Sequence, residues 1–276
     1  MLSSGKQPGG RWPGCRKTER KFVHMIRFVV ILVEVVIFAI LSLPILLVEW
    51  IIGKFNPRLQ SVSSFKIVRF EVKIIIWLAG TRVTVIGKEK VPTDKSVLYI
   101  CNHRSYLDIL LTYSLCHAPT GYIAKKEIRK IPILSIWMKF CHCLFLDRDD
   151  IRQGMETILK AIEYIKEGIS VCIYPEGTRN TNESEVELLP FHEGSFRVST
   201  RSGAPIIPVS ISNSREIFES HFPRVKACHV ILEYGDPIDP NQYDRMQQKH
   251  LGELTRQIIH DTLEKNQKLI DSAPDL

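Results

Sequence analysis

Hydrophobic residues follow two different patterns along the chain, one before and one after residue 80. From Phe28 to Val48 the chain reads FVVILVEVVIFAILSLPILLV, in which Glu34 is the single charged residue. A helix of this length, at about 1.5 Å per residue, reaches across about 30 Å of hydrocarbon. Glu34 would cost on the order of 3 kcal/mol at the centre of a bilayer, and Pro44 is expected to kink or end the helix.

A second apolar segment, Phe65 to Ala79, follows Asn56-Pro57 and carries basic residues at helical spacing (Lys66, Arg69 and Lys73). This pattern is typical of a helix in a membrane interface. We therefore expect residues 28–80 to form a membrane-embedded helical hairpin that spans the bilayer or dips into one leaflet. A cleavable signal peptide is disfavoured because no small-x-small site follows, and a buried soluble helix because the apolar run is too long.

From Thr81 onward, short strand-like runs alternate with helical patterns. The strand-like runs are 82–86, 97–101, 122–124, 143–146, 170–174, 206–212 and 227–234. The clearest helical pattern has apolar residues from Ile151 to Ile165 at steps of three and four, with Gly168 as its C-terminal cap. A charged, loosely amphipathic helix is expected over 241–270. This alternation predicts an α/β fold with a mixed, mostly parallel sheet covered by helices. The predicted organisation is a tail (1–27), the hairpin (28–80) and an α/β domain (81–276).

Almost all of the net charge lies in the tail. Residues 1–27 carry +6 of the formal net charge of +7, so the α/β body is nearly neutral. A nucleic-acid-binding protein is expected to have a basic stripe on its folded part, so nucleic acid is excluded as a partner. The positive-inside bias predicts a cytoplasmic tail, and the 45% hydrophobic composition excludes a disordered chain.

The seven cysteines are scattered through apolar stretches and do not frame loops, which favours a reducing compartment. A zinc site from Cys116, His117, Cys141, His142 and Cys143 is disfavoured, because paired ligands of structural zinc are usually two or more residues apart. We expect no metal and no cofactor.

Two loops at predicted strand ends carry the chemistry, since ligands of such sheets bind at the carboxyl ends of the strands. The first loop, 102–108, contains His103 and Asp108 in a His-x4-Asp pattern, and a turn between them would let the carboxylate approach the imidazole. Alternatively, Ser105 and Asp108 would form an N-terminal capping box with no catalytic role. His142 and Asp147 have the same spacing, but on a strand an odd separation points them to opposite faces.

The second loop, 175–180, reads Pro-Glu-Gly-Thr-Arg-Asn. Gly177 allows a ligand to approach the backbone, and Arg179 offers a planar fork that suits phosphate. The alternative for this loop is a plain turn with a surface ion pair. Cys101 next to the first loop suggests a Cys/His nucleophile as another alternative, which its apolar neighbours disfavour.

Several segments together resemble, in order and spacing, the four sequence blocks of the glycerolipid acyltransferases. Within that family the chain looks most like the bacterial 1-acylglycerol-3-phosphate (lysophosphatidate) acyltransferases. The segments are Asn102-His103-x4-Asp108, Phe145-Leu146-Asp147-Arg148, Glu176-Gly177-Thr178-Arg179, Phe191-x-x-Gly194 and Ala204-Pro205-Ile206-Ile207-Pro208-Val209. The resemblance covers about residues 80–235. Two positions depart from the family's pattern: His142 stands where glycine is usual, and His192 where Lys or Arg is common.

The resemblance implies an O-acyltransferase of phospholipid biosynthesis, which moves an acyl chain from an acyl thioester to lysophosphatidate and gives phosphatidate. His103 would be the general base and Asp108 its orienting partner, with direct attack by the hydroxyl and no acyl-enzyme. Phosphate binding would fall to Arg148, Glu176, Gly177, Thr178 and Arg179. The supporting site residues would be Asn102, Ser105, Phe145, Gly194, Pro205 and Pro208.

The partners implied are membrane lipids, lysophosphatidate, and acyl carrier protein or coenzyme A as the thioester co-substrate. The expected location is a membrane, with the active site on the cytoplasmic face of a bacterial inner membrane. Three alternatives stay open: another acceptor (a different lysophospholipid or glycerol 3-phosphate), a hydrolase that uses water as acceptor, and a non-catalytic protein that binds anionic lipid.

Overall fold

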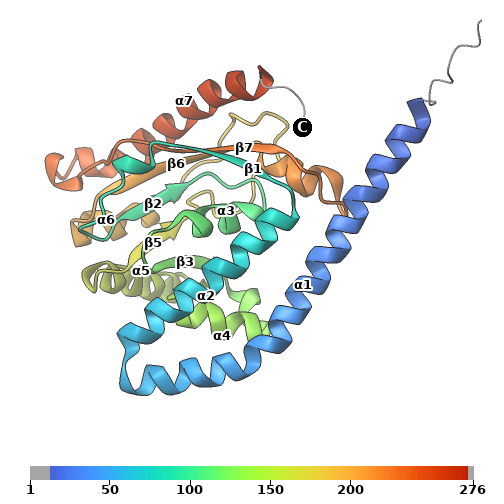
Figure 1. Ribbon diagram of the computed structural model, residues 1–276. Helices are drawn as coiled ribbons and strands as arrows, with labels where there is room; N and C mark the ends of the chain where they lie inside the picture. Colours follow the sequence, from blue (N-terminus) through green and yellow to red (C-terminus); the bar gives the residue numbers. More distant parts are fainter. Residues whose placement is uncertain (1–12, 273–276) are drawn as a thin grey trace, which may run out of the picture.

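A single sheet of seven strands lies at the centre of the α/β domain (Figure 1). The computed structural model describes residues 13–272, with side chains from residue 21 onward. The strands are β1 (Arg82–Ile86), β2 (Leu98–Cys101), β3 (Thr120–Lys125), β4 (Leu144–Leu146), β5 (Ser170–Ile173), β6 (Ile206–Ser212) and β7 (His229–Tyr234). Each lies within a predicted run or overlaps it, so the strand predictions are confirmed.

The strand order is β1-β7-β6-β2-β5-β3-β4, and neighbours are parallel except for β6 and β7, which are antiparallel. The expected mixed, mostly parallel sheet is therefore confirmed. β2, β5 and β6 are buried along their whole length. Their sequences are nearly continuous apolar runs because helices cover both faces of the sheet.

The helices form one layer on each face, and each layer has its own hydrophobic core. On one face, α2 (Pro57–Leu78) and α3 (Leu107–Leu115) contribute Phe65, Val72 and Leu111 to the first core. On the other, α5 (Ile151–Lys166) and α7 (Leu251–Asp271) contribute residues such as Ile162 and Ile259 to the second. The remaining helices are α1 (Pro13–Phe55), α4 (Pro132–Phe140), α6 (Arg197–Ser202), and the 3₁₀ turns η1 (Lys88–Lys90), η2 (Lys126–Lys130), η3 (Glu193–Phe196), η4 (Ser214–Ile217), η5 (Glu219–His221), η6 (Pro240–Gln242) and η7 (Gln247–His250).

Two helix predictions had different outcomes. α5 runs as its periodicity predicts, begins after Asp150, whose carboxylate accepts the Gln153 amide, and is followed by Gly168 at a φ of 85°. The final helix was predicted from residue 241, which is wrong, because it begins at Leu251. The carboxylate of Asp244 accepts the backbone N–H groups of Met246 and Gln247, which holds this stretch in a turn.

The hairpin predicted ahead of the sheet is present and consists of α1 and α2. Asn56 separates the two helices, and its side chain accepts the Leu59 amide while Pro57 occupies the first turn of α2. α1 begins at Pro13, so the hydropathy change at residue 28 is not a structural boundary. The helix also continues past Pro44, so the proline does not end it; α1 bends before it reaches α2 (Figure 1), as a proline inside a helix predicts.

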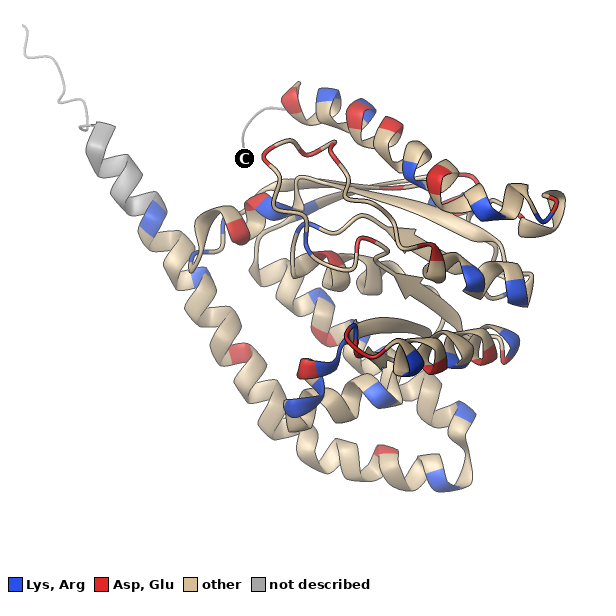
Figure 2. Ribbon diagram, turned by 180° about the vertical axis from the view of Figure 1, so that it is seen from behind, with Lys and Arg blue, Asp and Glu red and all other residues tan. Residues whose placement is uncertain are grey.

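Lys21–Phe55 of α1 is the one helical segment, within the described residues, that is long and apolar enough to cross a membrane. Only 11% of the most apolar 18-residue stretch of this segment is buried inside the structure. A core helix of a soluble protein would be mostly buried, so that alternative does not fit. Figure 2 shows α1 almost free of charged side chains along its middle, whereas charges alternate along α7. The first twelve residues of the predicted basic tail lie outside the described part of the chain.

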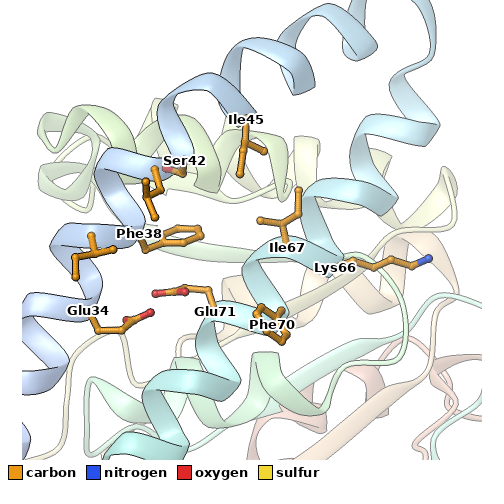
Figure 3. Close-up of a pocket in the computed structure, with 10 residues that line it drawn as sticks. Glu34, Phe38, Ser42, Ile45, Lys66, Ile67, Phe70 and Glu71 are labelled. Atoms are coloured by element: carbon orange, nitrogen blue, oxygen red, sulfur yellow. The ribbon is translucent and has the colours of Figure 1, made fainter.

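Glu34, the single charge in the apolar run, faces Glu71 of α2 across a cavity between the two helices (Figure 3). The cavity has a volume of about 510 Å³ and is lined mainly by apolar side chains of α1 and α2, such as Phe38 and Ile67. One carboxylate oxygen of each glutamate is buried without a hydrogen-bond partner. Two carboxyl groups that face each other in apolar surroundings cannot both ionise without repelling each other, so this pair is a weak point of the hairpin.

We predict that Glu71→Gln stabilises the hairpin, because an amide cannot ionise beside Glu34 and can donate a hydrogen bond to its carboxylate. The expected gain is about 1 kcal/mol, or a rise of about 2–4 °C in melting temperature, measured in detergent at pH 8 by circular dichroism. Glu156→Gln, on the exposed side of α5, serves as the control and should not change it. A lower melting temperature for Glu71→Gln would show that both carboxylates are needed.

Candidate active site

The predicted His103 and Asp108 pair forms at the carboxyl end of β2. The Nδ1 of His103 lies 2.9 Å from Oδ2 of Asp108. The Asp108 side chain is 1% exposed and that of His103 is 14% exposed. The imidazole is therefore anchored from the buried side and keeps one edge open. Because Nδ1 faces the carboxylate, Nε2 is the nitrogen that remains to exchange a proton with a ligand.

Asp108 also orders the turn between β2 and α3. Its Oδ2 accepts the backbone N–H groups of Arg104 and Ser105, each at 2.7 Å, and the Ser105 hydroxyl accepts the amide of Leu107 at 3.0 Å. The capping arrangement that the sequence offered as an alternative is thus present together with the His–Asp pair. One carboxylate both holds the loop and orients the imidazole.

Two other side chains tie this loop to the sheet and to the second loop. Asn102 pairs with the backbone of Ile211 in both directions, at 3.0 and 2.8 Å. Glu176 accepts the N–H of His103 at 2.8 Å and that of Leu189 at 3.0 Å. Burial raises the pKa of Glu176, whereas these two N–H groups act to lower it. The loops that follow β2 and β5 are therefore joined through a buried carboxylate.

The buried face of the imidazole is covered by Tyr174, whose ring centroid lies 4.5 Å from that of His103. The Tyr174 hydroxyl is hydrogen-bonded to Thr112, and burial raises its pKa well above the ordinary value. Cys101 is fully buried, its sulfur faces that of Cys172 at 3.5 Å, and burial also raises its pKa well above the ordinary value. This is the environment of an inert thiol, so the structure disfavours the Cys/His nucleophile.

A cavity of about 490 Å³ lies next to the pair, with Tyr174 in its lining. One wall is apolar and includes Ile151 and Met155 of α5, which are 83% and 55% exposed. Apolar side chains this exposed beside a cavity indicate a hydrophobic ligand or surface that covers them. The lining residues with cationic or imidazole side chains are Arg148, His192, Arg197 and Arg201.

The two arginines predicted to bind phosphate occupy different surroundings. Arg148 is exposed, lines the cavity and, among the described residues, has no recorded ion pair. The guanidinium of Arg179 stacks on the ring of Tyr106 at 3.6 Å and donates to its hydroxyl at 2.9 Å. It also pairs with Glu219 at 3.5 Å, and the side chain of Arg179 remains 34% exposed. The structure does not place Arg179 in the lining of the cavity.

The remaining predicted residues either lie near the cavity and the second loop or make structural contacts elsewhere. Gly177, at a φ of 71°, approaches His192 so closely that a Cβ would lie 2.9 Å from its Nε2. Gly194 lines the cavity, and Thr178 is exposed at the loop tip. The other three residues have structural contacts: Phe145 accepts from Gln153, Pro205 from Leu98, and Pro208 from Gly235.

His142 has a structural explanation. It has a φ of 59°, in the left-handed region where glycine is favoured, which matches the glycine usual there in the family that the chain resembles. Its Nε2 lies 2.7 Å from the Ser61 hydroxyl of α2, so the imidazole joins the sheet domain to the hairpin, and burial lowers its pKa. It does not meet Asp147, which pairs with Lys126.

Sequence reasoning missed several residues that shape the site. Tyr174 and Tyr106 gave no signal apart from their positions beside the two loops. Glu219 is far from both loops in the chain, yet it accepts the Tyr106 amide at 2.7 Å. Arg104 is 4% exposed and donates to backbone carbonyls of Asn182 and Ser184, which holds the chain after the second loop.

The chain is similar to known acyltransferases. Residues 82–212 match the family model described as acyltransferase. The 1-acyl-sn-glycerol-3-phosphate acyltransferase of Escherichia coli is 31% identical over 173 residues, which cover 61% of this chain and 69% of that protein. That of Borreliella burgdorferi is 29% identical over 201 residues, which cover 73% of this chain and 79% of the relative.

The fold is shared with a solved structure. The 1-acyl-sn-glycerophosphate acyltransferase of Thermotoga maritima superposes with a TM-score of 0.76 over 90% of this chain and 98% of its own, at 22% identity. This likeness confirms the fold, including an α/β sheet preceded by helices.

We predict that Glu176→Gln destabilises the site loops, because an amide offers one acceptor oxygen to two backbone N–H groups that the carboxylate satisfies together. The expected loss is about 1–3 kcal/mol, visible as a lower melting temperature and as faster hydrogen exchange at the His103 or Leu189 amide. Glu183→Gln, an exposed neighbour, is the control. Unchanged exchange at both amides would contradict the joining role of Glu176.

Proposed function

The chain belongs to the acyltransferase family, and on that premise we propose that it acylates the free hydroxyl of 1-acyl-sn-glycerol 3-phosphate to give phosphatidate. The chain is an O-acyltransferase, as its relatives are. The names of the relatives support 1-acyl-sn-glycerol 3-phosphate as the acceptor. The observation that carries the mechanism is the 2.9 Å contact between His103 and the buried Asp108, next to Tyr174, which lines a cavity.

In the proposed reaction, Nε2 of His103 takes the proton of the acceptor hydroxyl as its oxygen attacks the thioester carbonyl. Asp108 holds Nδ1–H and stabilises the imidazolium that forms. The carbon–sulfur bond then breaks, and the thiolate that leaves receives the proton from His103. The acyl group passes directly between the substrates, so no side chain of the protein is acylated.

The cavity beside Tyr174 supports the placement of an acyl chain. Its exposed apolar wall, with Ile151 and Met155, would be covered by hydrocarbon when a substrate binds. We assign the acceptor phosphate to Arg148 and Arg179, on loops that follow β4 and β5. Arg148 is accessible, whereas Arg179 would exchange its contact with Glu219 for the phosphate.

The substrates and α1 support a membrane location for the enzyme. The long apolar helix supports membrane association, and the basic residues ahead of it favour a cytoplasmic site on the inner membrane of a bacterium. The acyl donor is a thioester of either acyl carrier protein or coenzyme A. No cofactor is required by this mechanism.

We predict that His103→Ala and Asp108→Asn each lower kcat/KM by about 10²–10⁴-fold. The assay uses membranes that carry the protein, labelled acyl thioester and lysophosphatidate, with His250→Ala, an exposed histidine, as the control. Full activity in His103→Ala would contradict the mechanism. Equal release of fatty acid with and without lysophosphatidate would instead identify a hydrolase.

We predict that Arg148→Ala raises the KM for lysophosphatidate by about tenfold, the equivalent of one charge-assisted hydrogen bond. kcat should change less, because Arg148 does not touch the reacting atoms. Arg152→Ala provides a matched control, since Arg152 lies four residues further along, in the first turn of α5, and is 91% exposed. Equal effects of the two variants would show that the KM depends on overall surface charge and not on Arg148 itself. An unchanged KM in Arg148→Ala would show that Arg148 does not bind the phosphate.

A further inference from the structure

Tyr174 is a residue of the site that the proposed reaction leaves without a role. It follows β5 directly and stands two positions before Glu176, whose carboxylate accepts the backbone N–H of His103. The ring centroid of Tyr174 lies 4.5 Å from that of His103, with 36° between the two planes. Aromatic rings at this separation are in contact. Tyr174 therefore covers one face of the imidazole, whereas Asp108 holds its edge.

Buried hydrogen bonds fix the Tyr174 hydroxyl and lead back to Asp108. Thr112 of α3 donates its hydroxyl proton to backbone carbonyls of the preceding turn, of which that of Asp108 is the nearest, at 2.9 Å. The Tyr122 hydroxyl donates to Thr112 at 3.0 Å. A threonine hydroxyl has one proton and two acceptor positions. The 3.0 Å contact between Thr112 and Tyr174 is therefore a donation from the tyrosine.

The start of α3 thus holds the imidazole from two directions. Asp108 supplies the carboxylate at the edge of the imidazole, and Thr112, four residues later, fixes the ring that covers its face. Because the Tyr174 hydroxyl donates inward to a buried partner, it takes no part in proton exchange with a substrate. What Tyr174 offers to the reaction is the face of its ring, which attracts a cation within about 6 Å of its centroid.

We propose that Tyr174 is a positioning residue of the acyl transfer that acts through His103. Its ring keeps the imidazole against Asp108 and stabilises the imidazolium that forms as the acceptor hydroxyl loses its proton. The ring attracts the imidazolium more strongly than the neutral imidazole, so the contact favours the transition state over the ground state. The inference rests on the proposed function in one respect, namely that His103 gains a proton during the reaction.

Two simpler roles for Tyr174 make different predictions. A tyrosine that only fills space beside His103 would affect stability when replaced, but not the protonation of the imidazole. Tyr174 also lines the cavity, and a residue that only contacts bound substrate would affect KM and not kcat. A change in the protonation of His103, together with a change in kcat at constant KM, separates the proposed role from both.

Histidine NMR tests the proposal without any need for activity. The full chain carries isotope-labelled histidine in detergent micelles, and among its nine histidines the signal of His103 is assigned by its loss in His103→Gln. Tyr174→Leu keeps the surroundings apolar and removes the aromatic face. We expect the midpoint of the His103 titration to move to lower pH by about half a unit, because the imidazolium loses the ring that stabilises it. The nearby carboxylates, Asp108 and Glu176, are unchanged in this variant.

Two further variants serve as controls for the titration. Tyr174→Phe retains the ring, so it should restore the midpoint of the wild type. Tyr99→Leu is the matched control, because Tyr99 is a buried tyrosine of β2 whose ring packs on Tyr234 and not on His103. It should lower the melting temperature as Tyr174→Leu does, but leave the titration of His103 unchanged.

The kinetic readout is a split between kcat and KM. With acyl thioester and lysophosphatidate, Tyr174→Leu should lower kcat about tenfold and change either KM less than about twofold, since lost alignment adds to the lost cation contact. Tyr174→Phe should keep at least about half of kcat. If Tyr174→Leu does not fold, Thr112→Val takes its place, because it removes the acceptor that fixes the ring. kcat should then fall about threefold at constant KM.

Two results would overturn the proposal. One is a titration midpoint of His103 that Tyr174→Leu leaves unchanged, or that Tyr99→Leu shifts equally. The other is a raised KM in Tyr174→Leu at constant kcat, which would make Tyr174 a wall of the cavity and nothing more. If the wild type does not acylate lysophosphatidate, the proposed function fails, and the titration alone then supports or overturns the action of Tyr174 on His103.

Discussion

The Asp108 carboxylate is the group on which the site depends. A single oxygen, Oδ2, accepts from the imidazole of His103 and from two backbone N–H groups of the turn. The side chain is almost fully buried, where a carboxylate is stable only if such donors surround it. The position of the imidazole, the shape of the turn and the start of α3 therefore follow from one charged group.

The sheet makes that arrangement possible because its parallel strands end at the same edge. β2 and β5 are neighbours, so the loop with His103 and the loop with Glu176 meet, and Glu176 joins them through backbone hydrogen bonds. The cavity beside Tyr174 lies at this edge as well. The hairpin is attached to the same domain by Trp137 on Ser42 and by His142 on Ser61, which fixes the apolar helix relative to the site.

The seven strands, α5 and the His–Asp pair could be predicted because each depends on local pattern: apolar runs, helical periodicity and a spacing of five across a turn. The start of α1 could not, because basic and other polar residues interrupt the apolar positions of 13–27, which therefore give no continuous hydropathy signal. The approach of Glu34 to Glu71 and the ion pair of Arg179 with Glu219 could not be predicted either, because each brings together residues far apart in the chain. His142 shows the same limit, since its left-handed backbone is visible only once the turn is built.

The central claim is that His103, held by Asp108, activates the acceptor for direct attack on the thioester. Initial rates measured over a matrix of acyl-thioester and lysophosphatidate concentrations test it most directly. Direct transfer needs both substrates bound together, so double-reciprocal plots should intersect, and mass spectrometry should find no acylated protein when the thioester is added alone. Parallel lines together with a covalent acyl-protein would contradict the account.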